Sequence, residues 1–281
     1  MMEKDLQHLA DKDFRRERAW LAPSAFALSN GDDPPIYDLI SEEVWDHLMH
    51  LPDDVAIRTT NWTGSKVGLL HEVSMQWLFA TPIDPEGAPY APEPALLAAE
   101  EFEALEFAAL HGYYRQALGC LRNALETMTH AAALASTSRP DDFAAWRKGD
   151  LELGFRQSRM AIGESQIGMQ IEGHLGRGSL FGDLKAGGWL AILYRRLCAY
   201  AHSQAGFNNA DFWASNGPVY RPHAYAVVFD ELRETVAVSY VLLRVCWSTF
   251  KLPADLSTLL DEPALNNWPS LARRALSAAF T

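Results

Sequence analysis

Two adjacent arginines and a nearby histidine, all within residues 184–204, are the residues of this chain whose types and spacing could do chemistry. A histidine exchanges protons near neutral pH, and a guanidinium stabilises negative charge on a substrate. Arg195 precedes His202 by seven residues, which places the two on one face of a continuous helix. Arg196 precedes His202 by six residues and points about 120° away from it. Arg195, Arg196 and His202 are therefore the candidate catalytic residues.

The helix that must position these side chains is predicted from the apolar residues around them. Apolar and aromatic residues recur every three or four positions, as on one buried helical face. These residues are Trp189, Ile192 or Leu193, Leu197 and Tyr200. Gly206 follows the last of them, and glycine readily takes the left-handed conformation that ends a helix. His202 is therefore expected in or near the last turn, where the helix dipole favours its protonated form.

An arginine followed after four to six residues by a histidine, near the end of a bundle helix, resembles the motif of HEPN domains. HEPN domains are small helical bundles found in bacterial toxin, abortive-infection and CRISPR-associated ribonucleases. Five residues separate Arg196 from His202 and six separate Arg195 from it, so either arginine fits. Leu197 stands where the family usually has a polar residue after the arginine, if Arg196 is the motif residue. The resemblance covers residues 97–250.

The resemblance implies a metal-independent endoribonuclease of a toxin or phage-defence type. His202 would act as the base that takes the 2′-hydroxyl proton of RNA, or as the acid for the leaving oxygen. Arg195 or Arg196 would stabilise the negative charge that builds up at phosphorus. No cofactor would be required. One chain offers one motif histidine, so the resemblance implies a homodimer with His202 of each chain near a twofold interface.

A structural role for the same three residues remains the other interpretation. Arginines in an apolar helix usually pair with carboxylates of a neighbouring helix or extend to water. The alternative function is a non-enzymatic helical interaction or regulatory protein in a bacterial defence or toxin system, with a regulatory protein partner. If no dimer forms at His202, Arg221 and His223 are the nearby candidates for a second proton-transfer group.

The composition argues against several other classes of protein. The chain has 281 residues, a formal net charge of −12 and three cysteines without metal-ligand spacing. Its acidity argues against a broad phosphate-binding surface, so a contact with RNA would need a local basic patch. The histidines also lack metal-ligand spacing. A charged N-terminus and the lack of a long apolar run predict a cytoplasmic protein without a membrane span.

The hydrophobic periodicity predicts an all-α protein, namely a helical bundle with a HEPN-like four-helix core and an N-terminal helical extension. Core helices are expected near 95–136, 142–172, 186–204 and 231–251. Five prolines between residues 82 and 94 suggest a boundary. It would separate an N-terminal helical subdomain (1–90) from the bundle with its C-terminal helices (95–281).

A Gly-rich segment, GHLGRGSLFGD at residues 173–183, leads into the helix that carries Arg195. A plain connection between two helices is one interpretation of this loop. A cradle for a phosphate group is the other, because backbone N–H groups of Gly-rich turns bind anions. Both interpretations remain open from the sequence.

Overall fold

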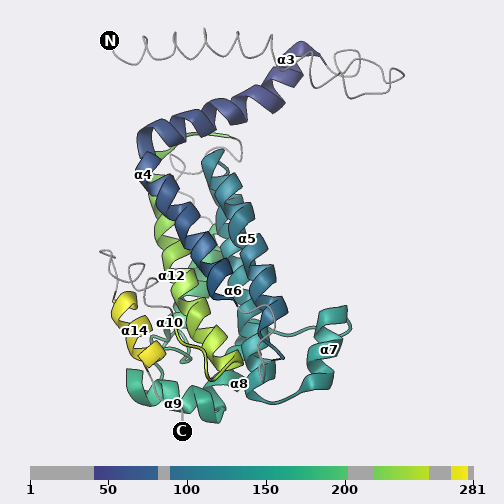
Figure 1. Cartoon of the computed structure of the whole chain (residues 1–281), viewed down its shortest axis with the longest axis vertical. Helices are drawn as coiled ribbons and strands as arrows, with labels where there is room; N and C mark the ends of the chain where they lie inside the picture. Colours follow the sequence, from purple (N-terminus) through teal and green to yellow (C-terminus); the bar gives the residue numbers. More distant parts are fainter. Residues whose placement is uncertain (1–40, 82–88, 202–217, 253–266, 278–281) are drawn as a thin grey trace.

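The computed structural model describes residues 41–81, 89–201, 218–252 and 267–277. The elements in chain order are α3 (Glu42–Trp45), the π-helical turn η1 (Asp46–His50), α4 (Leu51–Ala80), α5 (Pro92–Leu110), α6 (Tyr114–Ser136), α7 (Pro140–Lys148), α8 (Phe155–Glu164), α9 (Gln166–Leu175), α10 (Trp189–Ala201), α12 (Pro222–Cys246) and α14 (Trp268–Ser277). The described residues contain no β-strand, which confirms the predicted all-α helical bundle (Figure 1). Residues 1–40 of the predicted N-terminal subdomain lie outside the described ranges.

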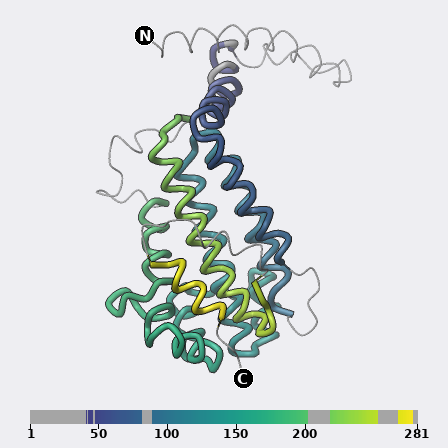
Figure 2. Tube along the Cα trace, turned by 60° about the vertical axis from the view of Figure 1, so that its left-hand side comes forward, coloured from purple at the N-terminus to yellow at the C-terminus, as the bar shows by residue number. Residues whose placement is uncertain are grey.

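Helix α6 is the centre of the bundle, since α5, α8, α10 and α12 all pack against it. The second half of α4 and the long helix α12 run alongside (Figures 1 and 2). Helix α10 is antiparallel to α6, because Arg115 near the start of α6 contacts Ala201 at the end of α10, while Arg122 contacts Tyr194. The end of α10 therefore lies beside the start of α6. Helices α8, α9 and α14 lie at the opposite end of the bundle (Figure 1).

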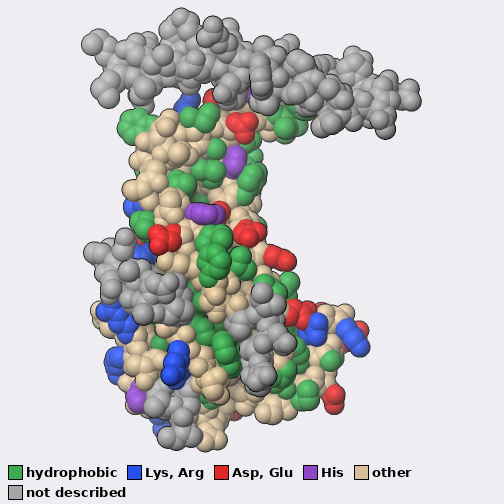
Figure 3. Space-filling view, viewed as in Figure 1, with side chains coloured by type: hydrophobic (Ala, Val, Ile, Leu, Met, Phe, Trp, Pro, Cys, Tyr) green, Lys and Arg blue, Asp and Glu red, His purple; other side chains and the backbone are tan. Residues whose placement is uncertain are grey.

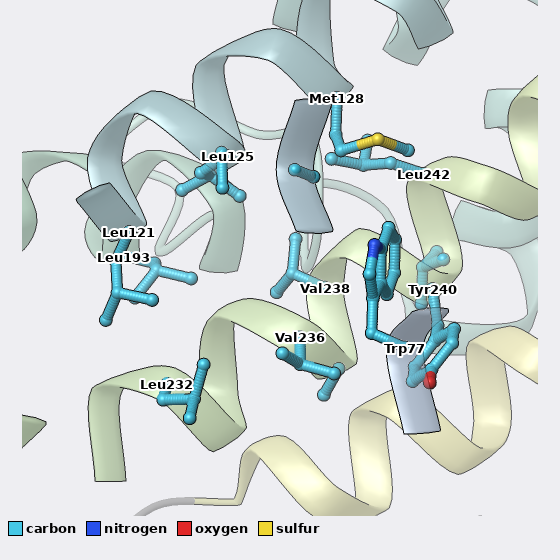
Figure 4. Close-up of a cluster of buried hydrophobic side chains, with 14 of the residues drawn as sticks. Trp77, Leu121, Leu125, Met128, Leu193, Leu232, Val236, Val238, Tyr240 and Leu242 are labelled. Carbon is cyan, nitrogen blue, oxygen red and sulfur yellow. The ribbon is translucent and has the colours of Figure 1, made fainter. Parts of the chain in front are cut away.

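The core consists of apolar side chains that recur on the inward faces of α4, α6, α10 and α12. The buried residues labelled in Figure 4 are Trp77, Leu121, Leu125, Met128, Leu193, Leu232, Val236, Val238, Tyr240 and Leu242. Trp77 is completely buried, and its indole Nε1 donates a hydrogen bond of 2.9 Å to the carbonyl of Ala95. Its ring packs against Phe102 and Tyr240. Trp77 thus joins α4 to α5 and α12 without leaving a buried polar group unsatisfied.

The prediction of a single long helix over residues 95–136 is wrong. Helix α5 ends at Leu110 and α6 begins at Tyr114, so the chain reverses direction between them. Gly112 makes this reversal possible with a φ of +80°, and a Cβ at this position would collide with the backbone of Val219. The apolar spacing continues across the turn because both helices bury a face in the same core. Periodicity alone therefore does not mark the break.

Two other predicted helices also differ from the structure. The prediction over 142–172 spans parts of three helices, which are separated after Gly149 (φ +79°) and at Ser165, whose hydroxyl caps α9. Helix α12 begins at Pro222, whereas the prediction began at 231. Proline is favourable in the first turn of a helix because its missing N–H has no intrahelical partner there. Residues 222–230, which lie outside the predicted helices, are therefore helical.

The first half of α4 leaves the bundle as a projecting arm, defined here as residues 42–62 (Figure 1). The bend falls at Thr63, whose φ of −131° and ψ of 21° are not helical. The hydroxyls of Thr59 and Thr63 each donate a hydrogen bond to the carbonyl four residues earlier, a contact that tends to bend helices. Five apolar side chains of the arm are exposed: Val44, Leu48, Met49, Ile57 and Trp62.

Candidate functional site

Arg196 points into the bundle and is held by two carboxylates of α12. Its Nε lies 2.5 Å from Oε1 of Glu231, and its Nη2 lies 2.5 Å from Oε2 of Glu234. Both glutamate side chains are more than nine-tenths buried. Oε1 of Glu234 also accepts a hydrogen bond of 2.7 Å from the indole of Trp189. Arg196 therefore acts as a cation that fixes α10 against α12.

The ion-pair group of Arg196, Glu231 and Glu234 carries excess negative charge when both carboxylates are ionised, because one guanidinium faces two carboxylates. Burial raises the pKa of Glu231 from 4.5 to about 7, although the hydrogen bond and charge of Arg196 lower it and Glu234 adds to the rise. Burial lowers the pKa of Arg196, but the hydrogen bonds and charges of the same carboxylates outweigh burial and raise it overall. The group thus keeps its guanidinium charged and binds a further proton near neutral pH.

The raised pKa of Glu231 predicts how stability depends on pH. Its folded-state pKa of about 7 lies above the ordinary 4.5, so the folded protein binds this proton more tightly than the unfolded chain. The resulting stabilisation is complete below pH 4.5 and is lost as the pH rises through 7. Between pH 5 and 8 we expect the unfolding free energy of the native protein to fall, relative to Glu231→Gln, by on the order of 2 kcal/mol.

Urea unfolding of both proteins at several pH values between 5 and 8 measures this difference. Glu164→Gln is the matched control, because Glu164 is exposed and its replacement should leave the pH profile close to that of the native protein. If the unfolding free energies of the native protein and Glu231→Gln differ by the same amount at every pH, the raised pKa of Glu231 would be contradicted.

Arg195 is exposed on α10, and no hydrogen bond or ion pair joins it to any other described residue. Adjacent side chains on a helix point about 100° apart, so Arg195 does not follow Arg196 toward α12. His202 lies outside the described residues and directly follows Ala201, the last residue of α10. Of the two candidate arginines, Arg195 is therefore the one whose guanidinium is available to an external anion.

Three segments meet where α10 ends. Nη2 of Arg115 in α6 donates a hydrogen bond of 2.9 Å to the carbonyl of Ala201, the last residue of α10. The hydroxyl of Tyr114 accepts a hydrogen bond of 3.0 Å from the backbone N–H of Arg221. Arg221 and His223 are exposed at the start of α12. The structure thus places both residues at the same end of the bundle as the end of α10.

A second polar contact between α6 and α10 involves Arg122, Glu126 and Tyr194, which no motif marks. Nη2 of Arg122 lies 3.1 Å from the hydroxyl of Tyr194 and 3.0 Å from Oε2 of Glu126. The hydroxyl donates to Glu126 at 3.0 Å, and the Tyr194 ring stacks on Phe155. Burial raises the pKa of Tyr194 to about 12, so this phenol stays protonated at neutral pH. The i, i+4 spacing of Arg122 and Glu126 is the sequence signal for half of this contact.

The Gly-rich loop, defined here as residues 176–188, connects α9 to α10. The carboxylate of Glu172 in α9 accepts hydrogen bonds of 3.0, 2.9 and 2.6 Å from the backbone N–H groups of residues 179–181. The loop therefore cradles an anion, and that anion is the carboxylate of its own chain. The first two residues of α10 donate backbone hydrogen bonds to carbonyls of the same segment. Glu172 thus organises both the loop and the start of the candidate helix.

Helices α8 and α9 and the Gly-rich loop enclose a pocket of about 880 Å³. Its lining includes Arg156, Arg159 and Arg177, together with Met160 and Met169. The pocket lies next to the start of α10, whereas the candidate histidine follows the end of that helix. The 13 residues of α10 separate the two places by about 20 Å. The pocket and the end of α10 are therefore two distinct candidate sites.

No protein-family model, curated protein or solved structure matches this chain. In the described ranges, no three His, Cys, Asp or Glu side chains are grouped so that they could hold a metal ion. Among the same residues, none of the helices combines the length and the apolar character needed to cross a membrane.

Proposed function

We propose that this protein is a metal-independent endoribonuclease of the HEPN type, which cleaves RNA at the end of α10. The observation that carries the proposal is the exposed guanidinium of Arg195, which no described acidic side chain occupies. Arg195 precedes His202 by the spacing of the motif. Arg196 is committed to two carboxylates, so we assign Arg195 as the motif arginine and Arg196 as a structural residue.

In the proposed reaction, His202 removes the proton from a ribose 2′-hydroxyl, and the 2′-oxygen attacks the adjacent phosphorus. The bond from phosphorus to the 5′-oxygen of the next nucleotide breaks, and that oxygen takes up a proton from an acid. The products are a 2′,3′-cyclic phosphate and a 5′-hydroxyl. Arg195 stabilises the charge on the non-bridging oxygens while phosphorus has five bonds to oxygen.

The reaction needs a base and an acid, so the proposal includes a homodimer in which each chain supplies one His202. A twofold axis beside the ends of the two α10 helices would bring both histidines to one groove. Arg115 and Arg221 contribute positive charge at this end of each protomer, which would offset locally the net charge of −12. An enzyme of this type would act in a cytoplasmic toxin or phage-defence system, under the control of a regulatory partner.

The test is cleavage of a fluorescently labelled single-stranded RNA of mixed sequence, with EDTA present to exclude metal catalysis. We expect the native protein to cleave it and both Arg195→Gln and His202→Ala to lose at least about 100-fold in rate, the usual effect of removing an acid–base or charge-stabilising group. Arg147→Gln is the matched control, because Arg147 is a half-exposed arginine on α7 that pairs with Glu93. Its cleavage rate should equal that of the native protein.

Light scattering at micromolar concentration tests the assembly, and we expect the mass of a dimer. A folded protein that is strictly monomeric, or that leaves the RNA intact, would contradict the ribonuclease proposal. Equal cleavage by the native protein and His202→Ala would do so as well, since it would trace the activity to a contaminant.

The second candidate function is that of a non-enzymatic interaction protein, and the projecting arm favours it. Apolar side chains stand exposed along residues 42–62, and Trp62 alone keeps 62% of its surface exposed. Large exposed aromatic residues are enriched where proteins bind one another. This candidate takes the place of the ribonuclease if the cleavage test fails while the protein is folded.

A further inference from the structure

The pocket beside the Gly-rich loop contains a buried cation that forms no ion pair with a described carboxylate. Arg159 in α8 is 5% exposed, and its Nη1 donates a hydrogen bond to the carbonyl of Phe181. The charge of the exposed Asp183 acts on this guanidinium, but from beyond ion-pair distance. Burying a charge without a directly bonded counter-ion is costly, so the position of Arg159 in a pocket wall suits it to bind an anion.

The surroundings of Arg159 carry charges of both signs. The charge of Asp183 favours the protonated form of Arg159, that of Arg156 disfavours it, and Arg177 lines the same pocket. Glu164, Glu172 and Asp183 also line it, but Glu164 and Asp183 are exposed, and the carboxylates of Glu172 and Asp183 already accept backbone N–H groups of the loop. Figure 3 shows further Lys and Arg side chains on the lower half of the visible face, toward the end where α9 and α14 lie.

Three N–H groups of the loop backbone are not available to the ligand's anionic group. The carboxylate of Glu172 accepts the N–H groups of residues 179–181. We therefore assign recognition to the guanidinium groups, whose planar forks suit phosphate oxygens. Three arginines favour a phosphomonoester over a carboxylate, because a phosphomonoester carries about 1.5 to 2 negative charges near pH 7.

Apolar side chains form another part of the wall, and the pocket is larger than an inorganic ion needs. Met160 and Met169 keep 43% and 58% of their surfaces exposed although they line the pocket, and Phe181 contributes an aromatic side chain. Methionine packs well against aromatic groups and adapts to their shape. A volume of about 880 Å³ is within the range of small-molecule sites. The pocket is therefore suited to a ligand with an apolar body attached to its anionic group.

We propose that this pocket binds a small aromatic phosphomonoester, with the phosphate on Arg159 and the aromatic body against Met160 and Met169. Arg156 and Arg177 complete the anion site from its exposed side. This site is separate from the end of α10 and does not depend on ribonuclease activity. A ligand in this pocket would contact the Gly-rich loop, which leads into α10.

Isothermal titration calorimetry on the full-length chain tests the proposal with phenyl phosphate as the probe. Inorganic phosphate and benzyl alcohol represent the two halves of the ligand, and each should bind at least tenfold more weakly than phenyl phosphate. Arg159→Gln should weaken phenyl phosphate binding at least tenfold, since it removes a buried charged hydrogen-bond donor. Arg58→Gln is the matched control, because Arg58 is an exposed arginine on the arm. This variant should bind phenyl phosphate with the affinity of the native protein.

Met160→Trp provides a second test that leaves Arg159 in place. The larger side chain should fill part of the pocket and reduce affinity for phenyl phosphate at least tenfold while affinity for inorganic phosphate stays within twofold. Absence of phenyl phosphate binding to the native protein would overturn the proposal, as would unchanged binding by a folded Arg159→Gln. If Arg159→Gln does not fold, Met160→Trp decides, and native-like binding of phenyl phosphate by that variant would overturn the proposal.

Discussion

Replacing Arg196 with Met is expected to lower the unfolding free energy by about 3 kcal/mol or more, because it leaves two buried carboxylates without their cation. Met preserves most of the apolar stem of the arginine, so the loss reports the charge and its hydrogen bonds. Glu231 and Glu234, both more than nine-tenths buried, would face each other, with the indole of Trp189 donating a hydrogen bond to Glu234. Urea unfolding at pH 8, above the Glu231 pKa of about 7 in the native protein, measures the effect.

The neighbouring residue supplies the matched control for this variant. Arg195→Met should change the unfolding free energy by no more than about 0.5 kcal/mol, because Arg195 is exposed and has no described partner. Adding Glu231→Gln and Glu234→Gln to Arg196→Met should recover part of the lost stability, since it removes the unpaired charges. If Arg195→Met and Arg196→Met lower the unfolding free energy equally, Arg196 is not the structural arginine.

Replacing Glu172 with Ala is expected to lower the unfolding free energy by about 3 kcal/mol, because three backbone N–H groups lose a charged acceptor. Two of these N–H groups belong to the buried residues Leu180 and Phe181, where water cannot easily replace the carboxylate. The same segment fixes the first turn of α10 and carries the carbonyl that Arg159 contacts. The change should therefore loosen the loop, the start of α10 and the pocket together.

Urea unfolding measures the loss of stability, and amide hydrogen exchange locates it in the segment around residues 176–190. Asp183→Ala is the matched control within the same loop. Its carboxylate accepts the exposed backbone N–H of Ala186, so its loss should cost far less stability than the loss of Glu172. Slow, native-like exchange throughout the loop of Glu172→Ala would contradict the proposed role of this carboxylate.

Much of the fold follows from the sequence, because helical periodicity records which side chains face the core. The apolar spacing around Trp189 and Leu193 predicted the helix now seen at Trp189–Ala201, and both residues are buried. The all-α class follows from the same pattern, since alternating strand patterns are almost absent. Helix boundaries were predicted less well. Gly112 reverses the chain inside a continuous apolar pattern, and Pro222 begins a helix that was predicted to start only at residue 231.

The polar contacts could not be predicted, because their partners are far apart in the chain. Arg115 contacts Ala201 across 86 residues, and Arg122 contacts Tyr194 across 72. The Gly-rich loop shows the same limit. Its glycines left open whether the backbone binds an anion, and only the folded chain shows that Glu172 occupies the N–H groups of residues 179–181. The buried Arg159 became a candidate only when α8 and the loop were seen to enclose it.

The sequence by itself determined the spacing of Arg195, Arg196 and His202, from which helical geometry predicts one helix that carries all three at a spacing suited to acid–base chemistry on a phosphate. It left open which arginine would do that chemistry, since both spacings fit. The tertiary structure alone distinguished them. Glu231 and Glu234 come from α12, more than thirty residues away, and their carboxylates meet Arg196 only after α10 and α12 pack together. Arg196 is thereby neutralised inside the bundle, and Arg195 remains exposed because no described acidic side chain is packed against its face of the helix.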